Sequence, residues 1–100
     1  MCSIVKGEMF FGAARSRDPA TSIAEQRDFF LHLYSFPFDD AAAEIYGHVR
    51  AELTKRGQLI GSNDMMIAAI CLANDLTLVT HNIAEFARVP GIKLEDWESP

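Results

Sequence analysis

The sequence has 100 residues, the size of one folded domain, and 49% of them are apolar, with only 4 Pro and 6 Gly. This composition is typical of a globular chain and excludes a disordered one. The formal net charge of −5 excludes a nucleic-acid binder that works through a general basic field. Contact with RNA or DNA would therefore need a local basic patch, or a metal ion that offsets the carboxylates.

The cysteine and hydropathy patterns indicate a reducing, cytoplasmic setting. Cys2 and Cys71 show no CxxC or Cys/His spacing, so neither a zinc site nor a disulfide framework is expected. No basic stretch leads into an apolar run near the N-terminus, and nowhere do 18 apolar residues follow one another. The pattern therefore predicts neither a signal peptide nor a membrane span.

The first third of the chain predicts a short extended segment followed by two helices. Cys2 to Val5 is short and partly β-branched, after which apolar residues recur at helical spacing up to Ala13. Residues 15–19 break this pattern, because Pro19 disfavours helix in the residue before it. A second amphipathic helix is expected over roughly Ala20 to Tyr34.

A third helix is expected after the extended stretch Phe36–Phe38. Either Asp39 or Asp40 is placed to cap its N-terminus, apolar residues then keep helical spacing, and Gly57 ends it.

The next two elements indicate the fold class. A helix over Met65 to Ala73 is apolar all round and should be buried, with Ser62 or Asn63 as its cap. Leu76–Thr80 follows as a continuous apolar strand of the kind found inside parallel sheets. Helices that alternate with short buried strands predict a layered α/β domain with a parallel sheet.

Glu8 is an acidic residue on a helix face that should be buried. It lies three residues after Val5 and four before Gly12, on the apolar stripe of the first helix. A buried carboxylate is costly unless it is paired. A salt bridge to a residue such as Arg15, a helix rotated toward solvent and a functional role all remain open for Glu8.

Two further acids flank the expected buried strand. Asp64 opens the apolar helix, where an acidic side chain interacts well with the positive helix end without any further role. Glu85 and Asn82 come just after the strand, at the edge where open α/β sheets usually bind ligands, although a solvated loop would also explain them. If the fold brings Glu8, Asp64 and Glu85 together, Mg²⁺ or Mn²⁺ would relieve their mutual repulsion and could support hydrolysis of a phosphodiester.

Three segments carry a resemblance to a known family. They are the opening CSIVKGEMFFGAARS, the segment HVRAELTKRGQ and the run IGSNDMMIAAICLANDLTLVTHNIAEFARVPGIKLEDW. From about Cys2 to Trp97 the chain resembles PIN-domain ribonucleases of the VapC toxin type. Its most specific parts are the D-x-x-I-A-A helix and the T-x-N-x-x-E-F-x-x-V-P-G segment.

The resemblance implies a single three-layer α/β/α PIN-like domain with a parallel sheet over residues 1–100. It also implies a Mg²⁺- or Mn²⁺-dependent endoribonuclease in which Glu8, Asp64 and Glu85 bind the metal and Asn82 assists in catalysis. Thr80 matches the hydroxyl residue that ends the strand in this family. The substrates expected from the resemblance are tRNAs, including initiator tRNA, and the expected partners are a cognate antitoxin and a second copy of the chain in a homodimer.

The chain departs from the family pattern at its start. Family members begin with a strand that carries an Asp ligand, followed by a helix, and neither precedes the part that matches Cys2. The expectation is an N-terminally truncated PIN domain, either because the true start lies upstream or because the chain is a remnant. Whether these 100 residues form an enzyme is therefore left open.

Two functions follow as hypotheses. The first is a ribonuclease toxin that holds RNA through basic side chains, for which the candidates are Arg15, Arg17, Arg50, Lys55, Arg56 and Arg88. The second is a catalytically inactive PIN domain that only binds an antitoxin or dimerises, using some of the many phenylalanines between residues 10 and 38.

Overall fold

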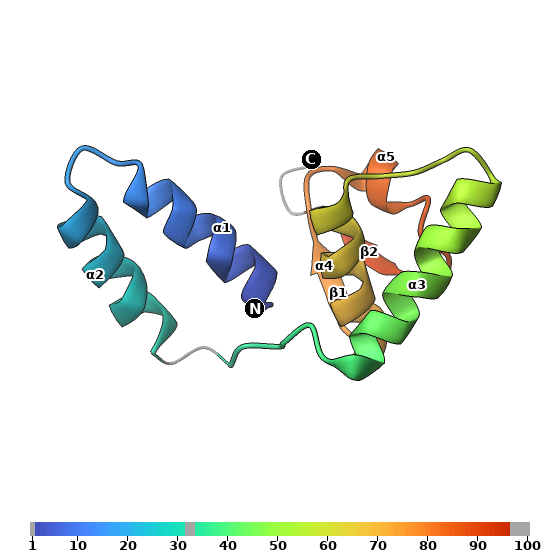
Figure 1. The fold of residues 1–100 in the computed structure, drawn as a ribbon, viewed down its shortest axis with the longest axis horizontal. Helices are drawn as coiled ribbons and strands as arrows, with labels where there is room; N and C mark the ends of the chain where they lie inside the picture. Colours follow the sequence, from blue (N-terminus) through green and yellow to red (C-terminus); the bar gives the residue numbers. More distant parts are fainter. Residues whose placement is uncertain (1, 32–33, 97–100) are drawn as a thin grey trace. The chain divides into compact units, whose positions relative to one another are not determined.

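The computed structural model describes residues 2–31 and 34–96. The chain divides into two compact units, Met1–Pro37 and Phe38–Pro100. In chain order the elements are α1 (Ser3–Ala14), α2 (Pro19–Phe30), α3 (Asp40–Lys55), α4 (Ser62–Ala73), β1 (Thr77–Val79), α5 (Ile83–Phe86) and β2 (Lys93–Glu95) (Figure 1).

The first unit is a hairpin of two helices, α1 and α2. Asp18 caps α2, since its carboxylate accepts hydrogen bonds from the Thr21 backbone N–H at 3.3 Å and the Thr21 hydroxyl at 2.6 Å. These two bonds hold the pKa of the Asp18 carboxyl below its usual value. Phe30 joins the helices, because its ring meets that of Phe10 edge-on at 5.3 Å and the Lys6 ammonium lies over it.

The expected extended segment at Cys2–Val5 is wrong, because α1 already begins at Ser3. Cys2 makes an isolated parallel bridge with Phe36, and the Ser3 N–H donates to the Phe36 carbonyl at 3.0 Å. Pro37 follows directly and has no N–H with which to continue a ladder.

The second helix also ends earlier than expected. It ends at Phe30, and Tyr34, the expected last residue, is not helical. Residues 32 and 33 of the expected helix lie outside the described residues. Leu31 and Tyr34 keep 73% and 70% of their surface exposed, so a longer helix would gain little burial in this unit.

In the second unit, α3 confirms the predicted cap and stop. Asp39 is the N-cap, and its carboxylate accepts a hydrogen bond from the Ala42 N–H at 2.9 Å. Gly57 adopts φ +67°, a left-handed conformation that favours glycine. The Gln58 N–H then donates back to the Leu53 carbonyl at 2.8 Å and closes the helix end.

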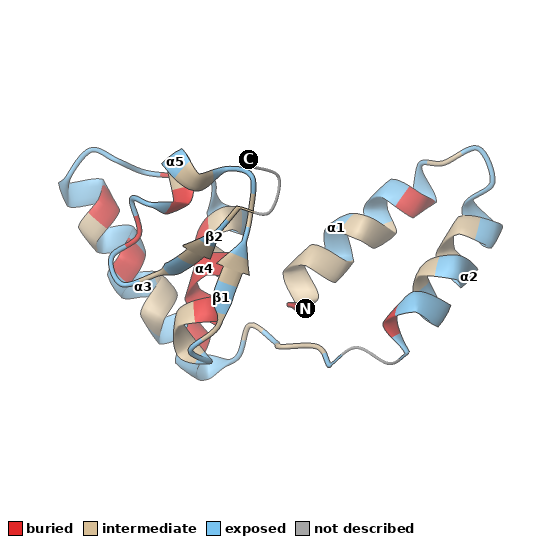
Figure 2. Cartoon of the chain, turned by 180° about the vertical axis from the view of Figure 1, so that it is seen from behind, coloured by how far each residue is buried: buried red, intermediate tan, exposed pale blue. Residues whose placement is uncertain are grey.

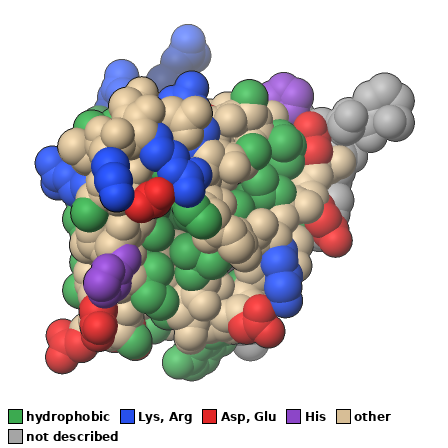
Figure 3. Space-filling view, turned by 90° about the vertical axis from the view of Figure 1, so that its right-hand side faces the viewer, with side chains coloured by type: hydrophobic (Ala, Val, Ile, Leu, Met, Phe, Trp, Pro, Cys, Tyr) green, Lys and Arg blue, Asp and Glu red, His purple; other side chains and the backbone are tan. Residues whose placement is uncertain are grey.

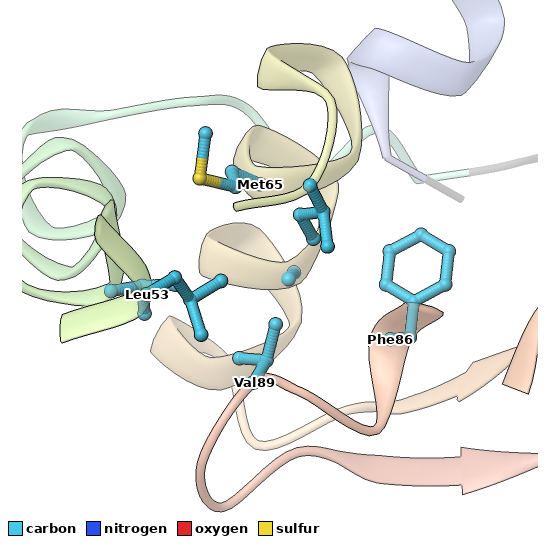
Figure 4. Close-up of a cluster of buried hydrophobic side chains, with 7 residues drawn as sticks. Leu53, Met65, Phe86 and Val89 are labelled. Carbon is cyan, nitrogen blue, oxygen red and sulfur yellow. The ribbon is translucent and has the colours of Figure 1, made fainter. Parts of the chain in front are cut away.

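The core of this unit forms between α3, α4 and the segment around α5. The helix α4 is buried over most of its length, as predicted, but its N-cap is Gly61 rather than Ser62 or Asn63. Figure 4 shows side chains from these separate segments converging on one cluster. The buried members of the cluster are Val49, Leu53, Ile60, Met65, Ala68, Phe86 and Val89.

The sheet of the second unit is parallel, as expected. Strand β1 pairs with β2 in the register Thr77↔Lys93, Leu78↔Leu94 and Val79↔Glu95. The expected fully buried strand Leu76–Thr80 is nevertheless wrong in length and burial, since β1 has three residues in the pattern exposed, half-buried, exposed (Figure 2). Side chains alternate along a strand, so Leu78 packs against the core cluster while its two neighbours point the other way.

The α/β class is therefore confirmed, while the three-layer arrangement stays a prediction. Within residues 2–31 and 34–96, no helix has the length and apolar character needed to cross a bilayer.

Candidate functional site

The candidate site lies where the chain leaves the carboxyl end of β1. The turn after β1 is held by a hydrogen bond from the Asn82 N–H to the Thr80 hydroxyl oxygen at 3.0 Å. Asn82 then becomes the N-cap of the short helix α5, which carries Glu85 in its first turn. This turn presents an amide and a carboxylate at the end of a parallel strand, the usual ligand position in open α/β sheets.

Glu85 connects this turn to the start of α4. Its Oε1 accepts a hydrogen bond from the Gly61 N–H at 3.4 Å, and its Oε2 accepts one from Asn82 Nδ2. Gly61 is the N-cap of α4, so Glu85 ties α5 to the first turn of the buried helix. Asn82 in turn restricts the orientation of the Glu85 carboxylate.

Asp64 is the third residue of α4 and is half-buried. Its Oδ2 would lie 3.7 Å from a Cβ atom placed on Gly61. Asp64 and Glu85 are thus both adjacent to Gly61, and the structure brings Asp64, Glu85 and Asn82 together around this residue. The positive end of the helix dipole favours the charged form of an acid in the first turn of a helix.

Glu8 lies in α1 of the first unit and is exposed. The expectation that it faces a buried stripe is wrong within this unit. In α1, Ala13 is the buried residue, and the helix packs against α2. The role of Glu8 as a site residue stays a prediction.

The donor chemistry of the site suits a hard divalent cation. Among the described residues, no group of three or more His, Cys, Asp or Glu side chains is arranged to hold a metal. Mg²⁺ usually takes one or two protein carboxylates and completes its coordination with water and phosphate oxygens. Asp64 and Glu85 supply that number of carboxylates, so the residues present fit a partial site of this kind.

Two features of the site were not predicted from the sequence. Gly61 acts as the meeting point of both acids, and Arg88, three residues after Glu85, donates from Nη1 to the Leu59 carbonyl at 3.3 Å. Glycine is an accepted N-cap residue, so its place directly before Ser62 could have indicated the helix start. The Arg88 contact spans 29 residues and leaves no local signal in the sequence.

The fold and these residues together define an α/β protein with acidic side chains at the carboxyl end of a parallel strand. The family model described as "PIN domain" matches residues 1–92, across both compact units. The chain belongs to the PIN-domain family.

Within that family the chain belongs with the VapC toxins of VapBC toxin–antitoxin pairs. It is 39% identical over 99 residues to "Ribonuclease VapC2" of Haemophilus influenzae and to "tRNA(fMet)-specific endonuclease VapC" of Salmonella typhimurium, covering 97% of this chain and 75% of each relative. Its structure is also similar to that of VapBC from Salmonella typhimurium bound to DNA, with a TM-score of 0.90 and 38% identity over 96% of this chain and 73% of that one. The chain thus spans about three quarters of the length of these relatives.

Proposed function

We propose that this protein is a metal-dependent endoribonuclease, the toxin of a toxin–antitoxin pair, and that it hydrolyses phosphodiester bonds in tRNA. The observation that supports this most directly is the approach of Asp64 and Glu85 to Gly61 beyond the carboxyl end of β1. The names of two relatives, a ribonuclease and a tRNA(fMet)-specific endonuclease, support the substrate class.

In this proposal the acidic residues hold the metal ion. Asp64 and Glu85 hold Mg²⁺ or Mn²⁺, and Glu8 supplies a further carboxylate from the first unit. The bound ion would supply Lewis-acid stabilisation of the phosphate and lower the pKa of a water molecule. Asn82 keeps the Glu85 carboxylate oriented through its side-chain amide.

The proposal extends to the assembly. It includes a single three-layer α/β/α PIN-like domain over residues 1–100. A cognate antitoxin is the proposed partner, because solved structures similar to this chain are VapBC complexes. A homodimer and a cytoplasmic setting belong to the same proposal.

A second candidate function is binding to the antitoxin without catalysis. Large apolar side chains of the first unit are exposed, as expected of a docking surface: they are Phe11, Phe29, Leu31 and Tyr34. In this reading the chain would bind its partner and leave RNA intact.

Cleavage of an initiator tRNA transcript by the purified full chain separates the two functions. Cleavage that requires Mg²⁺ or Mn²⁺ and stops with EDTA is expected, together with Mn²⁺ binding by calorimetry. Intact tRNA with no Mn²⁺ binding would overturn the ribonuclease proposal and favour the binding function.

The role of Glu8 is tested with a matched pair of variants in the first unit. Glu8 and Glu25 are both exposed helical acids, so both substitutions to Gln should leave the fold intact. Glu8→Gln should abolish cleavage and Glu25→Gln should not. Full activity in Glu8→Gln would remove Glu8 from the site.

A further inference from the structure

The basic residues of the second unit are unevenly placed. This unit has five Lys and Arg residues, and three of them fall within residues 50–60, a stretch with a single acid, although the whole chain carries a net charge of −5. A fourth, Arg88, directly follows the C-cap of α5. Figure 3 shows Lys and Arg side chains gathered toward the top of one face. We call Arg50, Lys55, Arg56 and Arg88 the basic patch.

Arg88 is held close to the acidic site. Its Nη1 donates to the Leu59 carbonyl, while Glu85 accepts from the Gly61 N–H, so both side chains bind the same loop. Leu59 and Gly61 are separated by one residue, so their Cα atoms can be no more than about 7 Å apart. The contact with Leu59 uses one of the five guanidinium donors, and the Arg88 side chain is exposed.

The remaining residues of the patch lie near the C-terminal end of α3, which leads into this loop. Lys55 is the exposed last residue of the helix, and Arg56 is its C-cap. Arg56 pairs with Glu52 at 2.8 Å, but the two side chains keep 50% and 42% of their surface exposed. An ion pair this exposed is weak and readily exchanged for a phosphate.

Helix-dipole stabilisation explains only part of the patch. Cations near a helix C-terminus are favourable without any ligand, and this accounts for Lys55 and Arg56. Arg88 follows a helix of four residues and bonds instead to a loop carbonyl beside the acidic site. Its placement therefore points to the site itself rather than to helix stability.

We propose that Arg88, Lys55 and Arg56 bind the RNA phosphates next to the bond that faces Asp64 and Glu85. This inference rests on the proposed ribonuclease function and assigns the positioning surface for its substrate. Phosphate contacts fix the register of a nucleic acid, so these cations would decide which bond lies at the carboxylates. Arg50 lies five residues before Lys55 in α3, and its Nη1 donates to the Tyr46 hydroxyl at 3.1 Å.

The test is RNA binding as a function of salt. A fluorescently labelled stem-loop RNA is titrated with the full chain in EDTA, so that no cleavage occurs. The titration is repeated at salt concentrations between about 0.05 and 0.5 M. Each lost phosphate contact to the single-stranded loop of this RNA should reduce the slope of log K against log salt by about 0.7. If variant and wild type bind equally at about 1 M salt, a slope change of about 0.7 makes the variant bind roughly fivefold more weakly at about 0.1 M.

The variants are chosen so that charge and position separate. Arg88→Gln and the pair Lys55→Gln with Arg56→Gln should lower the slope, whereas Arg88→Lys should restore it because the charge is kept. Lys93→Gln removes the same charge at the start of β2. Lys93 pairs with Thr77 at the start of β1, whereas the site follows the carboxyl end of β1, so this variant should leave the slope unchanged.

Three results would overturn the inference. One is an equal change of slope in Lys93→Gln and Arg88→Gln, which would indicate a general charge effect. Another is an unchanged slope in Arg88→Gln, which would leave only its structural contact with Leu59. Preferential binding of polyglutamate over the RNA would also refute it, since the patch would then serve an acidic protein.

Failure of the inference and failure of the proposed function give different results. Metal-dependent cleavage with an unchanged salt slope in Arg88→Gln would keep the ribonuclease and remove the patch. RNA binding that weakens as expected, without cleavage by the wild-type chain at any metal concentration, would overturn the ribonuclease and keep the patch as an RNA-binding surface.

Discussion

The replacement Asp64→Asn should separate catalysis from folding. Asp64 lies in the first turn of the 12-residue helix α4, where a carboxylate interacts with the positive helix end by about 0.3 to 1 kcal/mol. The amide has nearly the same shape but no charge, so the free energy of unfolding should fall by about that amount. For a domain of this size, the melting temperature should then fall by no more than about 8 °C.

Asp40 provides the matched control for this variant. It also lies in the first turn of a helix, α3, and is exposed, so Asp40→Asn removes a comparable interaction with the helix end. Both variants should therefore lose similar stability. Asp64→Asn alone should lose cleavage of initiator tRNA, because only Asp64 lies beside Gly61 and Glu85.

Thermal unfolding with and without Mn²⁺ measures metal binding independently of activity. A ligand at 100 times its Kd stabilises the folded state by about 2.7 kcal/mol. This gain should appear in the wild type and in Asp40→Asn, and should be lost in Asp64→Asn. Retained cleavage in Asp64→Asn, or equal loss of cleavage in Asp40→Asn, would refute the assignment of Asp64.

Three further predictions concern stability. Leu53 is fully buried in the core cluster, so Leu53→Ala should cost about 2 to 5 kcal/mol in urea unfolding, and a loss below about 1 kcal/mol would contradict the cluster. Asp39→Ala removes the N-cap of α3 and should cost about 1 kcal/mol by the same measurement, whereas an unchanged midpoint would argue against the cap. The Lys93 ammonium, 2.7 Å from Asp75, lowers the pKa of that carboxyl through a hydrogen bond and through its charge. Because its pKa is lowered, the Asp75 carboxyl stabilises the folded state above pH 3.8, its ordinary value, and this stability is lost as the pH falls through the folded-state pKa. Asp75→Asn should therefore make the free energy of unfolding depend less on pH in that range. An unchanged pH profile would contradict the role of this ion pair.

Local patterns in the sequence predicted α3, α4 and the position of β1 in the second unit, whereas α5 and β2 were not predicted. The helical spacing and Asp39 defined α3, and the apolar composition of α4 predicted its burial, because both signals lie within a few residues of one another. The alternation of helix and strand likewise predicted a parallel sheet. The Leu76–Thr80 strand was predicted too long and too buried, since an apolar run does not show which of its faces a neighbour covers.

What the sequence by itself determined is the family, the α/β class and the identity of Asp64, Asn82 and Glu85 as candidate site residues. Only the tertiary structure decided that these residues meet at Gly61 and that Glu8 is exposed on α1. The bond between Gly61 and Glu85 joins residues 24 positions apart, and the packing of α4 and α5 around Phe86 determines that distance. Contacts of this kind depend on how whole elements pack, and no local spacing in the chain encodes them.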